Sequence, residues 1–127
     1  MTMTRENSEA FASRWVEAWN RRDVDAVLEH FREDIVFTSP TALAVVGSPI
    51  VQGKDALRAY WTAALARIGS LRFTMDYVLW DPARRELAII YTSDIDGRIR
   101  RVSENLMFNE SGQVLAAEVF HGVPGPA

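Results

Sequence analysis

The stretch that decides the fold is residues 71–121, LRFTMDYVLWDPARRELAIIYTSDIDGRIRRVSENLMFNESGQVLAAEVFH. Apolar and polar residues alternate along it with a period of two, which predicts strands. Turn signals separate the strands, and the Asp96-Gly97 pair is typical of a hairpin because glycine accepts a positive φ. Asp81-Pro82 and Ser111-Gly112 are the other two. The pattern predicts a four-strand antiparallel meander of Leu71–Trp80, Glu86–Asp96, Ile99–Asn109 and Val114–Phe120.

Three segments before the meander have the spacing of three to four residues that is typical of a helix with one buried face. The first runs from Ser8 to Asn20. The second follows Asp23, a suitable N-cap, and is expected to end near Arg32. The third carries apolar residues from Leu57 to Ile68 and is expected to end at Gly69 in a left-handed conformation.

One further strand is expected between the second and third helices. It covers Ile35–Ser39 and is stopped by Pro40. Thr41–Gly53 contains Gly47 and Pro49 and is interpreted as a loop with a short strand around Ile50–Gln52. Helices early and a meander late predict an α+β domain, with three N-terminal helices on a strongly curved antiparallel sheet.

Composition excludes several classes of protein. The 127 residues fit one domain, 1–127, because chains divide only beyond roughly 250 residues. A net charge of −3 argues against a nucleic-acid partner. There is no cysteine, and His30 and His121 are the two histidines, so no metal site is expected. Neither a membrane-spanning stretch nor a secretion signal is found, which leaves the cytoplasm as the expected compartment.

The sheet face without helices also carries apolar residues. Alternation places Phe120 on it, and by parity Trp80 as well. A second copy, packed sheet on sheet, would cover this convex face. The sequence therefore predicts a homodimer.

At this point the chain resembles the nuclear transport factor two-like superfamily, whose cone-shaped fold is shared by ketosteroid isomerase and SnoaL-type polyketide cyclases. The residues that carry the resemblance are Phe11-x-x-x-Trp15-x-x-Ala18-Trp19-Asn20-x-x-Asp23-x-Asp25, Leu28-x-x-Phe31-x-x-Asp34-Ile35, Gly53-x-x-Ala56-Leu57-x-x-Tyr60-Trp61 and Asn109-x-x-Gly112-x-Val114. The resemblance implies a mostly apolar pocket between the helices and the concave sheet face. It does not imply one function, because this fold hosts enzymes, binding proteins and assembly modules.

The catalytic set of ketosteroid isomerase is not intact in this chain. Ser39 stands where the resemblance places the general base, and Trp15 stands where it places the tyrosine that donates to the oxyanion. Glu104 falls on the third position, a protonated aspartic acid. Steroid isomerisation by that mechanism is therefore disfavoured.

Glu104 is still the most informative polar residue. It alternates in phase with Val102, Leu106 and Phe108, which predicts that it points into the interior. A carboxyl group there is a ligand-binding or catalytic group with a raised pKa, or a structural group. As a structural group it would accept hydrogen bonds from neighbouring donors such as the indole of Trp15 or Trp19, or lie at the sheet edge.

His121 is expected diagonal to Glu104 across the last hairpin, with Val119 or Ala117 opposite Glu104. The two could act together as acid and base, or His121 simply ends its strand. Arg100 shares the parity of Glu104 and could reach the pocket mouth, where it would bind a carboxylate or enolate oxygen.

Five aromatic side chains either fill the core or line a cavity for a flat apolar ligand: Trp15, Trp19, Phe37, Tyr60 and Trp61. The sequence thus predicts a SnoaL-like, cofactor-independent protein for a small apolar or aromatic molecule. In an enzyme, Glu104 and His121 would be the acid–base groups, Trp15 a donor and Ser39 an orienting hydroxyl. The alternative is a non-catalytic binding or dimerisation module. An epoxide-hydrolase-like site would need an arginine between two acidic residues, which the sequence does not assemble.

Overall fold

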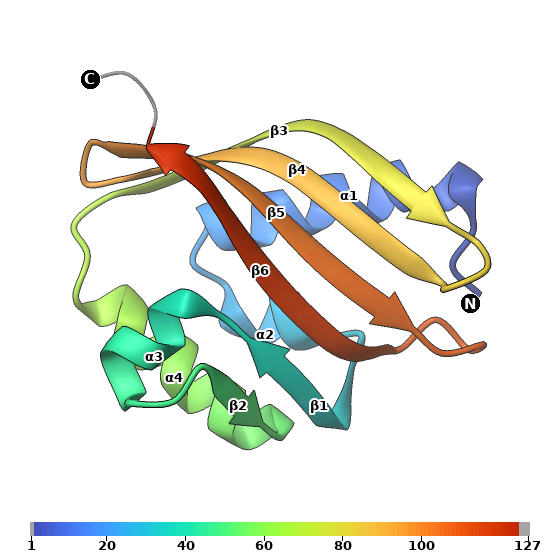
Figure 1. Ribbon diagram of the computed structural model, residues 1–127, viewed down its shortest axis with the longest axis horizontal. Coiled ribbons are helices and arrows are strands. Elements are labelled where there is room, and N and C mark those ends of the chain that lie inside the picture. Colours follow the sequence, from blue (N-terminus) through green and yellow to red (C-terminus); the bar gives the residue numbers. More distant parts are fainter. Residues whose placement is uncertain (1, 125–127) are drawn as a thin grey trace.

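The computed structural model describes residues 2–124, which form one mixed sheet with helices on one side of it (Figure 1). The strands lie in the order β2-β1-β6-β5-β4-β3. They are β1 (Phe31–Thr38), β2 (Ile50–Gln52), β3 (Leu71–Asp81), β4 (Glu86–Ile95), β5 (Arg98–Phe108) and β6 (Val114–Pro124). The expected α+β class and the meander β3–β6 are confirmed, since each consecutive pair is antiparallel.

The expectation of an antiparallel sheet was wrong at one strand pair. β1 lies parallel to β6, with Phe37 beside Ala117. β1 pairs with the edge of β6 that β5 leaves free. β2 pairs with the other edge of β1 and is antiparallel to it. Sequence periodicity identifies a strand but says nothing about the direction of its neighbour.

Helices α1 (Arg5–Asn20), α2 (Val24–Leu28), α3 (Pro40–Val46) and α4 (Lys54–Ala66) accompany the sheet. Asp23 caps α2 as predicted, and its side chain accepts a hydrogen bond from the backbone N–H of Ala26. α2 ends at Leu28 rather than near Arg32, because the chain enters β1 at the buried Phe31.

The predicted loop Thr41–Gly53 was wrong in its first half, which forms α3, so the described residues contain four helices instead of three. Pro40 stops β1 but suits the first turn of a helix, where its missing N–H costs no hydrogen bond. The Ser39 hydroxyl caps this turn by accepting from the N–H of Thr41 at 3.2 Å. The expected short strand Ile50–Gln52 is confirmed as β2.

Gly69 does not terminate the third expected helix. α4 ends at Ala66 with Arg67 as its C-cap. Gly69 accepts a hydrogen bond from Arg22 instead and lies against Asp96.

The core lies between the inner face of the sheet and the helices. α1 packs across β3, and α4 packs on β1. The side chains of Leu28, Ile35, Leu57, Leu87, Ile89 and Leu106 are fully buried there. The Asn20 side chain joins α1 to β3 by bonding both backbone groups of Phe73, at 2.9 and 2.7 Å. No helix in residues 2–124 is long and apolar enough to cross a bilayer.

The outer face carries Phe120, as predicted, but not Trp80. Phe120 is 50% exposed, whereas Trp80 packs toward the core against Phe108. A register irregularity between Met75 and Tyr77 shifts the parity of β3 by one residue. Strict alternation counted from Leu71 therefore assigns the wrong side to Trp80.

Candidate functional site

A cavity of about 320 Å³ lies between the helices and the inner face of the sheet. Every strand except β2 and every helix except α2 contributes to its wall. Its lining is predominantly apolar and consists of Trp19, Phe37, Ser39, Thr41, Val45, Tyr60, Trp61, Ala64, Leu65, Arg67, Ile68, Leu71, Phe73, Tyr91, Ile95, Glu104 and Val119. A volume in this range is large enough for a small molecule.

Glu104 is the central polar group of this cavity. Its place in β5, opposite Ile89 of β4 and Val119 of β6, directs the side chain inward. The residue is 5% exposed, and burial raises the pKa of the carboxyl group to about 8. Within residues 2–124 no group donates a hydrogen bond or an ion pair to this carboxyl group.

Two phenols lie near Glu104. Burial raises the pKa of Tyr91 well above its usual value, and the charge of Glu104 raises it further. Burial and Glu104 also raise the pKa of Tyr60, while a hydrogen bond to Ser39 opposes the change. Both phenols therefore remain protonated near neutral pH and can donate hydrogen bonds into the cavity.

The indole N–H groups of Trp15 and Trp19 do not donate hydrogen bonds to Glu104. The Nε1 atoms of Trp15 and Trp19 are buried, and neither has a hydrogen-bond partner in the described chain. Trp19 lines the cavity, but Trp15 lies one turn away on α1 and lines a different hollow of about 210 Å³ between α1 and α2. Neither indole therefore donates a hydrogen bond to Glu104, as one form of the structural alternative would require.

His121 and Arg100 are near the site but outside it. The register places Val119 opposite Glu104 and His121 opposite Val102, which confirms the expected diagonal relation. However, His121 is only half-buried and does not line the cavity. Burial lowers its pKa, and the positive charge of Arg100 lowers it further. Arg100 itself is exposed.

The structure thus brings together six of the residues that the sequence singled out, and leaves three outside. Around the cavity lie Trp19, Phe37, Ser39, Tyr60, Trp61 and Glu104. Trp15, Arg100 and His121 do not line it. In the described residues no group of three or more His, Asp or Glu side chains is placed to hold a metal ion.

Sequence reasoning missed Tyr91, Phe73 and Thr41. Tyr91 alternates in phase with the buried Leu87 and Ile89, so the period of β4 was a signal that could have found it. Phe73 has the same signal in β3. Thr41 had none, because the helix that carries it was interpreted as a loop.

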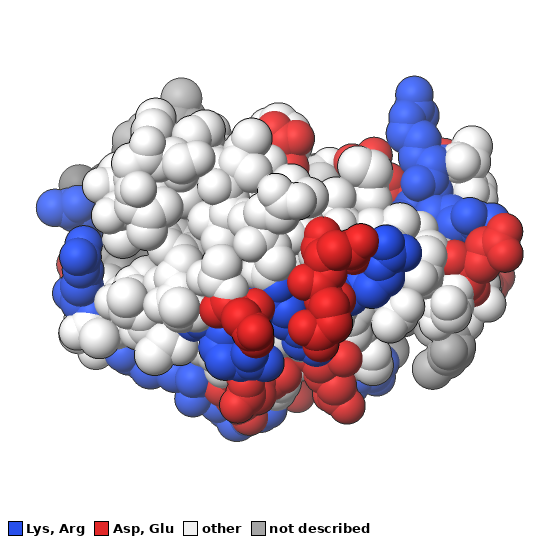
Figure 2. Space-filling view, turned by 90° about the horizontal axis from the view of Figure 1, so that it is seen from below, with Lys and Arg blue, Asp and Glu red and all other residues white. Residues whose placement is uncertain are grey.

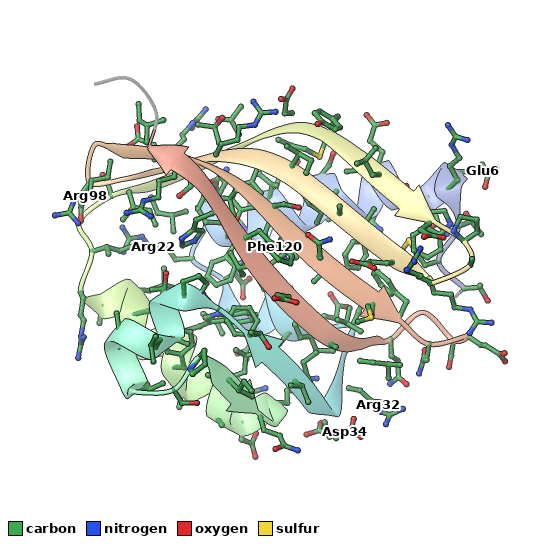
Figure 3. The ribbon with its side chains drawn as sticks, viewed as in Figure 1. Glu6, Arg22, Arg32, Asp34, Arg98 and Phe120 are labelled. Atoms are coloured by element: carbon green, nitrogen blue, oxygen red, sulfur yellow. The ribbon has the colours of Figure 1, made fainter. Side chains whose placement is uncertain are left out.

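Arg22 and Asp96 hold the segment between α4 and β3, which forms part of the cavity rim. The Arg22 guanidinium, labelled in Figure 3, donates to the carbonyls of Leu65, Ile68 and Gly69 at 3.3, 3.4 and 2.7 Å. The Asp96 carboxylate accepts from the N–H groups of Gly69 and Ser70 at 2.9 and 2.8 Å. This rim is therefore fixed by contacts made outside the cavity.

Comparison with known proteins identifies the family of this chain and structures of similar fold. The family model of the SnoaL-like domain matches residues 12–101. A SnoaL-like protein of unknown function from Burkholderia thailandensis is 28% identical, with a TM-score of 0.83 over 96% of this chain and 99% of that chain. No curated protein matches the sequence.

Two more distant structures show the shared fold. An NTF2-like protein of unknown function from Burkholderia pseudomallei is 20% identical, with a TM-score of 0.78 over 94% of this chain and 92% of that one. SalBIII is described as an epoxide hydrolase/cyclase-like enzyme in pyran ring formation in polyether salinomycin. It is 15% identical to this chain, with a TM-score of 0.72 over 93% of this chain and 92% of that one. The expected resemblance to the nuclear transport factor two-like superfamily is confirmed.

Proposed function

Since this chain belongs to the SnoaL-like domain family and has a cavity between its helices and its sheet, we propose that it binds a small, largely apolar molecule in this cavity. We propose further that Glu104 exchanges a proton with the bound molecule. One observation carries the proposal: Glu104, a residue that is 5% exposed, faces a cavity, and its carboxyl group has no partner among the described residues. Buried carboxyl groups in proteins are usually hydrogen-bonded, because leaving one unpaired costs free energy. A bound ligand would supply the missing partner.

The chemistry expected of this arrangement is cofactor-independent acid–base catalysis. Near neutral pH the carboxyl group is mainly protonated and can act as a general acid, and its ionised fraction can act as a general base. The phenols of Tyr60 and Tyr91 would donate hydrogen bonds to an oxygen that gains negative charge. Isomerisation, cyclisation and dehydration all need such groups, and SalBIII, of the same fold, is described as cyclase-like.

Binding in the cavity is tested with a matched pair of α4 variants. Ala64 lines the cavity and the adjacent Ala63 is exposed, so Ala64→Phe fills the cavity whereas Ala63→Phe does not. We expect 2-naphthol to quench tryptophan fluorescence and raise the melting temperature of the wild type and of Ala63→Phe, but not of Ala64→Phe. Equal binding by both variants would place the ligand elsewhere.

Proton transfer is tested with a probe reaction that needs only a base in an apolar site. In the ring opening of 5-nitrobenzisoxazole, the base removes the carbon-bound proton while the N–O bond breaks to give a coloured phenolate. We expect the rate to rise with pH up to about pH 8 and to be lost in Glu104→Gln. Glu17→Gln, on the exposed side of α1, is the control. A rate that survives in Glu104→Gln would remove Glu104 from the chemistry.

We also propose that a second copy of the chain covers the outer face of the sheet. No described helix lies over this face (Figure 1), and its exposed large apolar side chains include Ile50, Tyr77, Leu79, Met107 and Phe120. The register aligns Tyr77, Ile90, Ser103 and Phe120 in one row across the strands. Residues 38–53 contain no charged residue, and Figure 2 shows a broad uncharged surface on the side of α3 and β2.

The dimer is tested by sedimentation of Phe120→Glu and of Ala63→Glu, which places the same charge on the exposed side of α4. We expect a dimer for the wild type and the α4 variant, and a monomer for Phe120→Glu, because burying an unpaired carboxylate in a sheet-on-sheet interface is costly. A wild-type monomer at micromolar concentration contradicts the proposal.

A further inference from the structure

The described wall of the cavity contains one buried acid and no buried base. Besides the tyrosines, Glu104 and Arg67 are the ionisable residues in its wall. Arg67 follows the end of α4 and is exposed. Burial alone determines the raised pKa of Glu104, with no opposing effect from Arg67, Arg100 or His121. The cavity therefore contains a buried acid with which no basic side chain of the described residues pairs.

Aromatic rings surround this acid. Six of the lining residues are aromatic: Trp19, Phe37, Tyr60, Trp61, Phe73 and Tyr91. They pack against one another, with ring centroids 4.8 Å apart for Trp19 and Trp61 and 4.7 Å apart for Phe73 and Tyr91. The face of an aromatic ring carries negative electrostatic potential and attracts cations.

We infer that the ligand of this cavity carries a positively charged nitrogen: it is a hydrophobic amine whose ammonium group pairs with Glu104 while the aromatic rings hold its hydrocarbon part. The inference rests on the proposed binding site and names its substrate class. A neutral carbonyl ligand would accept a hydrogen bond from protonated Glu104 but would gain nothing from the attraction between aromatic rings and a cation. A carboxylate ligand would repel the ionised form of Glu104 and could pair with no buried base among the described residues of the cavity.

Proton release accompanies this mode of binding. In the empty cavity Glu104 is mostly protonated near pH 7. An ammonium ion favours the ionised carboxylate, so the proton of Glu104 is released to the buffer as the amine enters. The titratable groups that face Glu104, Tyr60 on α4 and Tyr91 on β4, remain neutral at this pH and do not supply the proton.

The test uses three ligands of one shape and different charge: 1-adamantanamine, 1-adamantanol and 1-adamantanecarboxylate. Calorimetric titration at pH 7 is expected to give an order of affinity of amine, alcohol, carboxylate, with the amine about tenfold tighter than the alcohol. Glu104→Gln should lose this preference while still binding the alcohol. Glu17→Gln, which changes an exposed carboxylate on α1 outside the cavity, should keep it.

Titrations in phosphate and in Tris, whose ionisation enthalpies differ, measure the proton release directly. We expect a fraction of a proton to be released per amine bound in the wild type and none in Glu104→Gln. The inference is overturned if the alcohol binds as tightly as the amine, if the preference survives in Glu104→Gln, or if the amine does not bind. If the inference is overturned but 2-naphthol still binds in the cavity, the proposed binding function stands. If 2-naphthol does not bind either, the proposed function and the inference both fail.

Discussion

Replacing Glu104 with glutamine should change how the stability of the protein depends on pH. The pKa of Glu104 is about 8 in the folded chain, against an ordinary value of 4.5. Between these values the unfolded chain ionises at this residue while the folded chain keeps its proton. Stability therefore falls as pH rises through this window, because the folded state binds more protons than the unfolded state. Glutamine has no proton to lose and removes this dependence.

The size of the effect follows from the same two values. Each pH unit inside the window lowers the free energy of unfolding by at most about 1.4 kcal/mol. From about pH 5.5 to pH 7.5 the wild type should lose up to roughly 3 kcal/mol relative to Glu104→Gln. His121 acts in the opposite direction, since its folded pKa is lowered by burial and its contribution improves as pH rises. It is present in both proteins and cancels in their difference.

Urea unfolding at a series of pH values and at one protein concentration measures this difference. Glu17→Gln on α1 is the control, because its side chain is exposed and lies away from the outer sheet face, and its profile should run parallel to that of the wild type. Parallel profiles for the wild type and Glu104→Gln between about pH 5 and 8 would refute the argument. They would mean that Glu104 is solvated or paired in solution.

Two further changes test how the cavity walls are held, and a third tests backbone strain in the turn between β3 and β4. Asn20→Ala removes both bonds to the Phe73 backbone and should cost about 1–3 kcal/mol in urea unfolding, whereas a cost near zero would show that β3 does not need this link to α1. Arg22→Ala should lower the free energy of unfolding by about 1 kcal/mol and speed amide exchange in residues 67–70. Arg21→Ala is the control and should do neither, because the nearest carboxylate to Arg21 is 3.9 Å away. Arg85→Gly should raise the melting temperature, because Arg85 has a φ of 51° that glycine adopts without strain; a lower melting temperature would show that its contact with Glu110 matters more.

Local patterns predicted much of this molecule. The meander followed from alternation and the Asp96-Gly97 turn, and the inward direction of Glu104 followed from its place among Val102, Leu106 and Phe108. Both depend on interactions within a few residues or between neighbouring strands. The helix α3 was missed because Pro40 stops a strand and also begins a helix, and the sequence pattern of so short a helix does not separate these two roles.

By itself the sequence determined the strands of the meander, the first helix and an acid facing the interior, because the periods of strands and helices are set by backbone geometry. Only the tertiary structure decided that β1 runs parallel to β6, that Trp80 faces the core, and that Tyr91 and Tyr60 meet Glu104 around a cavity. These features depend on which distant segments come together and on one irregularity in β3. Neither can be predicted from a local sequence pattern, because both depend on how elements remote in the sequence pack against one another.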